Sequence, residues 1–248
     1  MGDLIPEAHV KGSLGWSLIA FICSKNSATF SALSLSKIIR QMYKVFIDNT
    51  PLYIIDEVKE MLPNAVYIHS ENITSIQDAI FAFSKKVELS HPIYIVSEDQ
   101  EATFKKLFTG FEYIEASGGI VQRGNKYLFI KRNGSWDIPK GKLEKNEDPA
   151  LGAVREIEEE CGIINPKIEK LITTTYHTYK LKNKPKIKKT FWYALSYEGS
   201  SKTKPQKEEG ITKVKWFKKA EFDTIRANTF ESILDVIDVY KPTETKLI

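Results

Sequence analysis

The chain has 248 residues, of which 42% are hydrophobic and 27% are charged. This ordinary globular composition excludes collagen-like, disordered and membrane-embedded chains. The 36 Lys and Arg and 32 Asp and Glu give a formal net charge of +4, too small to predict a nucleic-acid binder from charge alone. The two cysteines, Cys23 and Cys161, lie far apart. We therefore expect neither a disulfide framework nor a cysteine-rich zinc site, and this usage fits a reducing cytoplasm.

Residues 1–41 read as a leader whose status the sequence leaves open. Residues 12–24 are uncharged, but this run is shorter than the roughly 20 residues of a membrane-spanning helix. A signal peptide is a rival interpretation, although Asp3 and Glu7 disrupt the basic start that it needs. Because a clear strand pattern begins at Met42, we hypothesise that Met42 is the native start. Intact mass spectrometry of protein from the natural source would refute this by finding residues 1–41.

Residues 42–110 predict a small α/β domain. Short runs rich in β-branched and aromatic residues predict strands, and two stretches with apolar residues at helical spacing predict helices. The strands are expected at residues 43–47, 51–55, 65–68 and 92–96, and the helices at residues 75–86 and 98–108. This part contains no phosphate-binding loop and no metal-ligand motif. Its role is left open between shaping a substrate pocket, mediating a homodimer, or both.

Residues 111–248 predict a second, larger domain with longer strands. The strands are expected at residues 112–122, 126–132, 167–180, 186–197 and 212–217, and the helices at residues 149–161 and 229–240. Residues 123–125 form the turn between the first two strands, and the third and fourth strands pair as a long hairpin.

The helix predicted at residues 149–161 carries an acidic cluster. Asp148 is its expected N-cap and Gly162 its stop. Three glutamates share one sector of this helix because they are spaced i, i+3 and i+4: Glu156, Glu159 and Glu160. Like charges at this spacing repel each other by roughly a few tenths of a kcal/mol per pair, so a cation should offset them. Arg155 supplies part of that charge, and clustered carboxylates favour Mg²⁺ or Mn²⁺ for the rest.

Residues 141–163 resemble the Nudix box, Gly-x5-Glu-x7-Arg-Glu-U-x-Glu-Glu-x-Gly-U, in which U is a bulky aliphatic residue. The residues at its specified positions are Gly141, Glu147, Arg155, Glu156, Ile157, Glu159, Glu160, Gly162 and Ile163. Every specified position matches, which rarely happens by chance. The chain is therefore similar to the Nudix hydrolases over residues 113–240. The resemblance implies a Nudix α/β/α sandwich with a mixed sheet, preceded here by the small α/β domain.

The resemblance also implies hydrolysis of a nucleoside diphosphate linked to a further group, with Mg²⁺ or Mn²⁺ held by the box. It implies that Glu156 and Glu160 are metal ligands, that Glu159 is a ligand or supports one, and that the Gly141 carbonyl is a further ligand. Hydrolysis of a diphosphate requires such a site, because a carboxylate-bound cation can activate water and neutralise diphosphate oxygens.

The remaining box residues are expected to orient the metal ligands. Arg155 and Glu147 take this role by resemblance. The general base varies within the family, so it is either a box glutamate or a glutamate on a later loop. Glu208 and Glu209 are candidates for the latter, and a solvated pair of glutamates is the alternative interpretation.

Substrate recognition is predicted from two further segments. The run Trp136-Asp-Ile-Pro-Lys-Gly141 is similar to the loop that precedes the box in diadenosine polyphosphate hydrolases, and six lysines lie within residues 180–189, at the tip of the hairpin. A lysine-rich tip would attract a polyphosphate, although a solvated tip is equally consistent. The residues expected to contact substrate are Arg132, Trp136, Lys140, Tyr176, Lys189 and Trp192.

These features predict a cytoplasmic, metal-dependent pyrophosphohydrolase that acts on a dinucleoside polyphosphate or a nucleoside triphosphate. An ADP-ribose or nucleotide-sugar pyrophosphatase is the alternative enzyme, and a nucleotide-sensing regulator with the same fold is the alternative outside the enzyme class. The expected partner is a small nucleotide. We expect no membrane partner, and no nucleic-acid partner, because the lysine cluster is one hairpin without a recognised nucleic-acid module.

Overall fold

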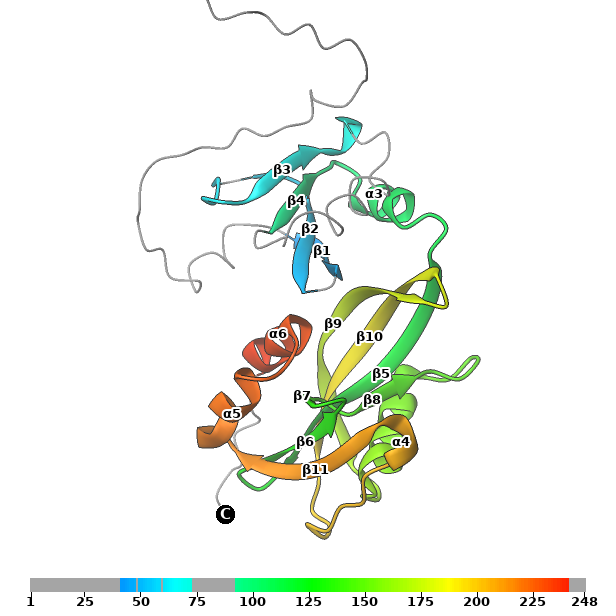
Figure 1. Ribbon diagram of the computed structural model, residues 1–248, viewed down its shortest axis with the longest axis vertical. Helices are drawn as coiled ribbons and strands as arrows, with labels where there is room; N and C mark the ends of the chain where they lie inside the picture. Colours follow the sequence, from blue (N-terminus) through cyan, green and yellow to red (C-terminus); the bar gives the residue numbers. More distant parts are fainter. Residues whose placement is uncertain (1–40, 48, 59, 73–91, 241–248) are drawn as a thin grey trace, which may run out of the picture.

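The computed structural model describes residues 41–47, 49–58, 60–72 and 92–240 (Figure 1). Nearly all of the expected leader and the helix expected at residues 75–86 lie outside these residues. One mixed sheet runs through the described part, in the order β11-β6-β5-β10-β9-β1-β2-β4-β3, with β7 paired to β6 and β8 to β5. None of the described helices is both long and apolar enough to cross a lipid bilayer.

The N-terminal part of the sheet matches the four predicted strands. Its elements are β1 (Gln41–Ile47), β2 (Thr50–Ile55), β3 (Val66–His69), the short 3-10 helix η1 (Ser70–Asn72), β4 (Ile93–Val96) and α3 (Gln100–Leu107). Strands β2 and β3 both pair in parallel with β4. Asp99 caps α3 by accepting a hydrogen bond from the backbone N–H of Ala102 (2.8 Å). On one face of these strands, Val45 and Ile95 belong to the same buried cluster as Leu107 of α3.

The C-terminal part also contains every predicted strand and helix. Its elements are β5 (Glu112–Arg123), β6 (Lys126–Arg132), β7 (Ser135–Asp137), β8 (Lys140–Lys142), α4 (Pro149–Cys161), β9 (Lys167–Leu181), β10 (Lys184–Ser196), η2 (Lys207–Glu209), β11 (Ile211–Lys218), η3 (Lys219–Glu221), α5 (Phe222–Arg226) and α6 (Glu231–Val239). The sequence pattern did not predict β7, β8 or α5, because such short elements are too brief to show a period.

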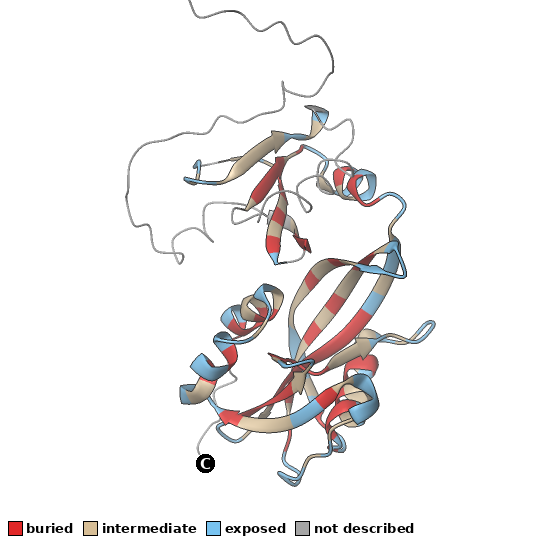
Figure 2. Cartoon of the chain, viewed as in Figure 1, coloured by how far each residue is buried: buried red, intermediate tan, exposed pale blue. Residues whose placement is uncertain are grey.

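Helices cover both faces of this part of the sheet (Figure 1). Successive residues of a strand point to opposite faces, and buried positions alternate with partly exposed ones along residues 190–194 of β10 (Figure 2). Ile120 packs in a cluster with Ile233 of α6, whereas its neighbour Val121 packs with Ile157 of α4. The predicted α/β/α sandwich with a mixed sheet is confirmed.

The N-terminal strands continue the sheet of the C-terminal part. Strand β1 pairs in parallel with β9, with Val45 opposite Tyr176. Helix α6 contacts this junction, because Lys44 Nζ on β1 lies 2.5 Å from an Oδ of Asp235 on α6. The domain boundary between residues 110 and 111 stays a prediction. Hydrogen bonds between β1 and β9 join the parts of the chain on its two sides.

Candidate active site

Helix α4 begins and ends where its sequence predicts. The Asp148 carboxylate accepts hydrogen bonds from the backbone N–H groups of Ala150 (2.8 Å) and Leu151 (3.1 Å), and Pro149 takes the first turn. Gly162 ends the helix with a φ of +65°, a conformation that glycine adopts without strain. These caps fix the position of the acidic sector of α4 relative to the preceding loop.

Glu160 is the most buried carboxylate of the acidic sector, with 2% of its surface exposed. Its Oε2 accepts the backbone N–H of Lys140 (2.9 Å), and Arg132 Nη1 lies 3.5 Å from its Oε1. Burial raises the pKa of Glu160 to about 7, although Lys140 and Arg132 act in the opposite direction. A cation bound beside this carboxylate would favour its ionised form.

Glu156 lies against the backbone of β8. A Cβ atom built at Gly141 would come within 1.8 Å of Glu156 Oε2, so any other residue at position 141 would displace this carboxylate. Burial raises the pKa of Glu156, and Arg155 acts in the opposite direction. The box glycine thus leaves room for the Glu156 carboxylate in this position.

Arg155 organises the other acidic residues of the box. Its Nε and Nη2 atoms bind the two carboxylate oxygens of Glu147, each at 2.8 Å. Its Nη1 donates to Glu156 (2.8 Å) and to Glu159 (3.3 Å), and its Nη2 also donates to the carbonyl of Lys142 (3.0 Å). The hydrogen bonds from Arg155 lower the pKa of Glu147. A planar guanidinium is suited to hold several carboxylates in fixed directions.

The donor chemistry of this cluster fits Mg²⁺ or Mn²⁺. Carboxylate oxygens from Glu156, Glu159 and Glu160 project from adjacent turns of one helix, and the backbone of Gly141 lies against one of them. Within the part of the chain that the structure describes, no three such side chains converge on a single point. Arg155 donates hydrogen bonds to Glu156 and Glu159, while the backbone N–H of Lys140 donates to Glu160.

Arg132 connects the box to a later loop. Its Nη2 atom lies 2.7 Å from Glu209 Oε2, and the same guanidinium approaches Glu160. The loop is held in place by the backbone N–H of Gln206, which donates to the Glu160 carbonyl (3.2 Å). Glu209 is therefore joined to the acidic sector through one shared arginine.

Comparison with known proteins gives the family. The sequence matches the NUDIX domain over residues 113–235. This part of the chain is a Nudix domain. A MutT-like protein of Streptomyces ambofaciens is 39% identical over 70 residues, which are 27% of this chain and 43% of that protein. An RNA pyrophosphohydrolase of Roseobacter denitrificans is 31% identical over 68 residues, which are 25% and 42% of the two chains.

The alignments therefore span less than half the length of these two relatives. Among solved structures, the MutT NUDIX hydrolase of Burkholderia pseudomallei is 20% identical, and the similarity covers 52% of this chain and 99% of that one with a TM-score of 0.42.

Three further charged groups of the Nudix domain lie near the box. Lys140, the first residue of β8, forms an ion pair with Asp137, which is 5% exposed. The Lys140 ammonium lies 5.8 Å from the ring of Trp192. Lys188 shares the face of β10 that carries Trp192, and burial, followed by the charge of Lys140, lowers its pKa to about 8.

Lys188 and Asp137 were not singled out from the sequence. Lys188 was one of six lysines at the hairpin, and only the register of β10 separates it from its neighbour Lys189. The available signal for Asp137 was its place between the apolar residues Trp136 and Ile138, because an acid that is buried among apolar residues needs a cationic partner.

Four of the predicted substrate contacts stay predictions, and the structure gives the surroundings of each. Tyr176 packs against the Phe104 ring, with centroids 5.1 Å apart, on the opposite face of the sheet from Lys188. Lys189 shares that opposite face and lies 4.0 Å from Glu115. The other two are core residues: Trp136 is 7% exposed and Trp192 is 1% exposed. Of the six predicted contacts, the structure brings only Arg132 and Lys140 together with Glu160.

Proposed function

We propose that this protein is a Mg²⁺- or Mn²⁺-dependent pyrophosphohydrolase that cleaves a diphosphate bond in a nucleoside diphosphate linked to a further group. A dinucleoside polyphosphate or a nucleoside triphosphate fits best, and the chain is proposed to act in the cytoplasm. The observation that carries the proposal is the buried Glu160 carboxylate, contacted by Arg132 and the Lys140 backbone, within a complete Nudix box. The names of the two relatives, a MutT-like protein and an RNA pyrophosphohydrolase, support the same class.

Each group of side chains has a distinct task in this proposal. Glu156, Glu159, Glu160 and the Gly141 carbonyl hold the cation. When bound, the cation neutralises diphosphate oxygens and lowers the pKa of the attacking water. Arg155 and Glu147 keep the carboxylates of the box in place.

Positively charged side chains beside Glu160 bind the substrate. Arg132, Lys140 and Lys188 attract the phosphate oxygens, and their partial burial strengthens that attraction. A box glutamate or Glu209 accepts the proton of the attacking water. Glu209 is a candidate because Arg132 holds it beside Glu160.

Two other functions are the alternatives to the leading one. An ADP-ribose or nucleotide-sugar pyrophosphatase would use the same box with a different pocket. A nucleotide-sensing regulator would keep the fold for binding alone, but such a protein has no need for the full acidic set. The bidentate contact of Arg155 with Glu147 is further support for an enzyme, because it orients carboxylates that only metal binding requires.

The decisive experiment is an assay of nucleoside triphosphates, dinucleoside polyphosphates, ADP-ribose and nucleotide sugars with Mg²⁺ or Mn²⁺, with products identified by chromatography. Glu160→Gln should lower kcat by roughly 10³-fold or more, about 4 kcal/mol, because it weakens the charge that holds the cation. Glu144→Gln is the matched control, since Glu144 is exposed in the loop that precedes α4 and is not a specified position of the box. It should leave kcat unchanged.

The outcome of this assay separates the three functions. Turnover confined to ADP-ribose or nucleotide sugars would replace the leading substrate class. Nucleotide binding without turnover on the whole panel would favour the regulator. Normal activity of Glu160→Gln would contradict the role given to the box.

A further inference from the structure

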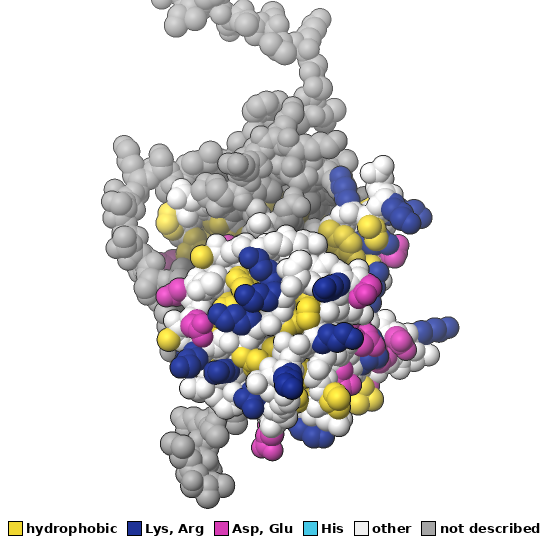
Figure 3. Space-filling view, turned by 60° about the horizontal axis from the view of Figure 1, so that its bottom comes forward, with side chains coloured by type: hydrophobic (Ala, Val, Ile, Leu, Met, Phe, Trp, Pro, Cys, Tyr) yellow, Lys and Arg dark blue, Asp and Glu magenta, His cyan; other side chains and the backbone are white. Residues whose placement is uncertain are grey.

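Asp137 is buried next to the Nudix box but has no task in the hydrolysis proposed above. Its side chain and that of its partner Lys140 are 7% and 12% exposed. By contrast, many Lys and Arg side chains lie on the surface of the face that Figure 3 brings forward. Taking two charges out of water costs several kcal/mol per ion, so a buried ion pair is weak evidence for stability. The place of this pair points instead to a role in the site.

The Asp137 carboxylate is fixed in direction, whereas the lysine that it binds is flexible. Its Oδ1 accepts the backbone N–H of Ile138 (2.8 Å), a residue that is fully buried. Its Oδ2 binds the ammonium of Lys140, which also donates to the Ile138 carbonyl (3.4 Å). A lysine carries its charge on a four-carbon chain that can turn to other acceptors. The carboxylate therefore selects one position of the ammonium.

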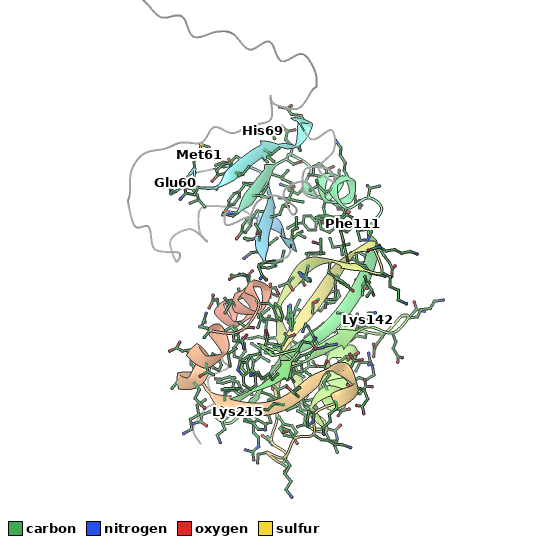
Figure 4. All side chains as sticks on the ribbon, in the orientation of Figure 1. Glu60, Met61, His69, Phe111, Lys142 and Lys215 are labelled. Atoms are coloured by element: carbon green, nitrogen blue, oxygen red, sulfur yellow. The ribbon has the colours of Figure 1, made fainter. Side chains whose placement is uncertain are left out.

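The main chain of Lys140 contacts a proposed metal ligand. Lys140 opens the three-residue strand β8, which ends at Lys142, labelled in Figure 4. Its backbone N–H donates to Glu160 Oε2 (2.9 Å), so the long side chain of the same residue can also reach this carboxylate. Two cations can thus compete for Glu160: the proposed divalent ion and the Lys140 ammonium.

The other neighbours of the Lys140 ammonium would drive it towards Glu160 if Asp137 lost its charge. Lys188 on β10 is close enough for the two positive charges to act on each other, and after burial the charge of Lys140 is the main cause that lowers the pKa of Lys188. The ring of Trp192, 5.8 Å away, offers only the weaker attraction of an aromatic face. Among these groups, Glu160 is the one that carries a negative charge.

We propose that Asp137 is a positioning residue that holds the Lys140 ammonium away from Glu160 and so leaves this carboxylate to the divalent cation. This rests on the proposed metal-dependent function and adds to it the residue that keeps a metal ligand available. The ammonium held in this way stays beside the site, where it attracts the phosphate oxygens of the substrate.

The test measures Mn²⁺ binding to the full chain without substrate, from the electron paramagnetic resonance signal of free Mn²⁺. Asp137→Asn keeps the size of the side chain and the oxygen that accepts the Ile138 N–H, but removes the charge. It should raise the Kd for Mn²⁺ by about 10-fold or more, because the released ammonium competes for Glu160.

Two double variants separate positioning from a general effect of charge. Asp137→Asn/Lys140→Met removes the competing ammonium and keeps the backbone N–H, so it should return the Kd to within about twofold of the wild-type value. Asp137→Asn/Lys188→Met removes a neighbouring ammonium instead and should leave the Kd raised. Equal restoration by both, or none by Lys140→Met, would overturn the positioning role.

A third variant controls for a loss of stability, because breaking a buried ion pair destabilises the fold. Thr175→Val is the matched control: Thr175 is 7% exposed and accepts the indole N–H of Trp192 (2.8 Å), and its replacement changes no charge. It should lower the Tm in EDTA and leave the Kd for Mn²⁺ unchanged. A Kd raised as much as in Asp137→Asn would contradict the inference.

The outcomes distinguish this inference from the proposed function. Absence of Mn²⁺ binding to the wild-type protein would overturn both. Mn²⁺ binding of equal strength in the wild-type protein and Asp137→Asn would overturn the inference alone. If Mn²⁺ binds but no substrate on the panel is hydrolysed, the proposed function fails, and the Kd values of the variants still decide the role of Asp137.

Discussion

The Nudix domain and the N-terminal strands share one sheet but bury different kinds of groups. In the Nudix domain, helices cover both faces, and Glu160 and Asp137 are buried among cations. Among the described residues of the N-terminal part, the buried polar groups are neutral hydroxyls such as Ser97 and Thr103, which bond to each other (2.7 Å). The comparison teaches that one part uses burial to stabilise the sheet, while the other tolerates buried charge that its proposed chemistry needs.

The two faces of the N-terminal strands carry different kinds of uncharged side chains. One face packs Val45 and its neighbours under α3. The other carries a row of tyrosines from adjacent strands, Tyr53, Tyr94 and Tyr67, whose ring centroids lie 4.7 and 5.1 Å apart. The parallel register sets Tyr94 level with both of the others, so the stack follows from strand pairing.

The largest expected effect tests whether the two parts unfold together. Val45→Asp places a carboxylate at a fully buried position of β1, opposite Tyr176 on β9, and should destabilise the fold by about 3–5 kcal/mol. Because the ladder joins the two parts, denaturation followed by fluorescence of the Nudix tryptophans should shift as much as circular dichroism. Lys106→Asp, at an exposed site on α3, is the control and should shift neither. An unchanged tryptophan transition would show that the two parts fold independently.

A smaller effect concerns the buried charge of the Nudix domain. The pKa of Glu160 is about 7 in the folded protein, against 4.5 for an unperturbed glutamate. The folded state therefore holds more protons between these values, so this residue makes stability fall as pH rises from about 4.5 to 7, by on the order of 3 kcal/mol. In EDTA, Glu160→Gln should remove this part of the pH dependence of Tm.

The same measurement with Mg²⁺ completes the test. Metal binding requires the ionised carboxylate, so added Mg²⁺ should raise the Tm of the wild-type protein most above pH 7 and have little effect on the Tm of Glu160→Gln. Identical pH profiles of the two proteins in EDTA would contradict the assignment of a raised pKa to Glu160.

The smallest expected effect concerns the contact between α6 and β1. Lys44 and Asp235 are both partly exposed, with 21% and 33% of their side-chain surfaces accessible. A double-mutant cycle with Lys44→Ala and Asp235→Ala should give a coupling energy of about 0.5–1 kcal/mol from denaturant unfolding. The exposed pair Arg226 and Asp238, within the C-terminal helices, is the comparison and should couple less. A coupling energy of zero for Lys44 and Asp235 would mean that this ion pair does not stabilise the contact between α6 and β1.

Local signals in the sequence were enough to predict most elements and the Nudix box. The caps of α4 depend on Asp148, Pro149 and Gly162, which act within one turn and so are readable without the fold. The strands of both parts follow from short periodic runs. The Nudix box is likewise a local pattern, because its specified residues lie within one continuous segment, residues 141–163.

The substrate side of the site could not be predicted in the same way. Whether Lys188 or Lys189 approaches the box depends on the face of β10, and a shift of one residue would exchange them. Tyr176 read as a candidate for stacking on a base, but the pairing of β1 with β9 places it, partly buried, against the hydrophobic cluster that contains Val45. These positions are decided by pairing between distant segments, on which a single strand carries no information.

The sequence by itself determined the Nudix box, the two ends of its helix and the positions of most strands. Each of these arises from interactions between residues close in the chain. Only the tertiary structure decided that β1 extends the sheet at β9, that Arg132 joins Glu160 to Glu209, and that Lys131 lies opposite Lys213. The physical reason is that register and strand order are set by burial over the whole sheet, which brings together charges that are far apart in the chain.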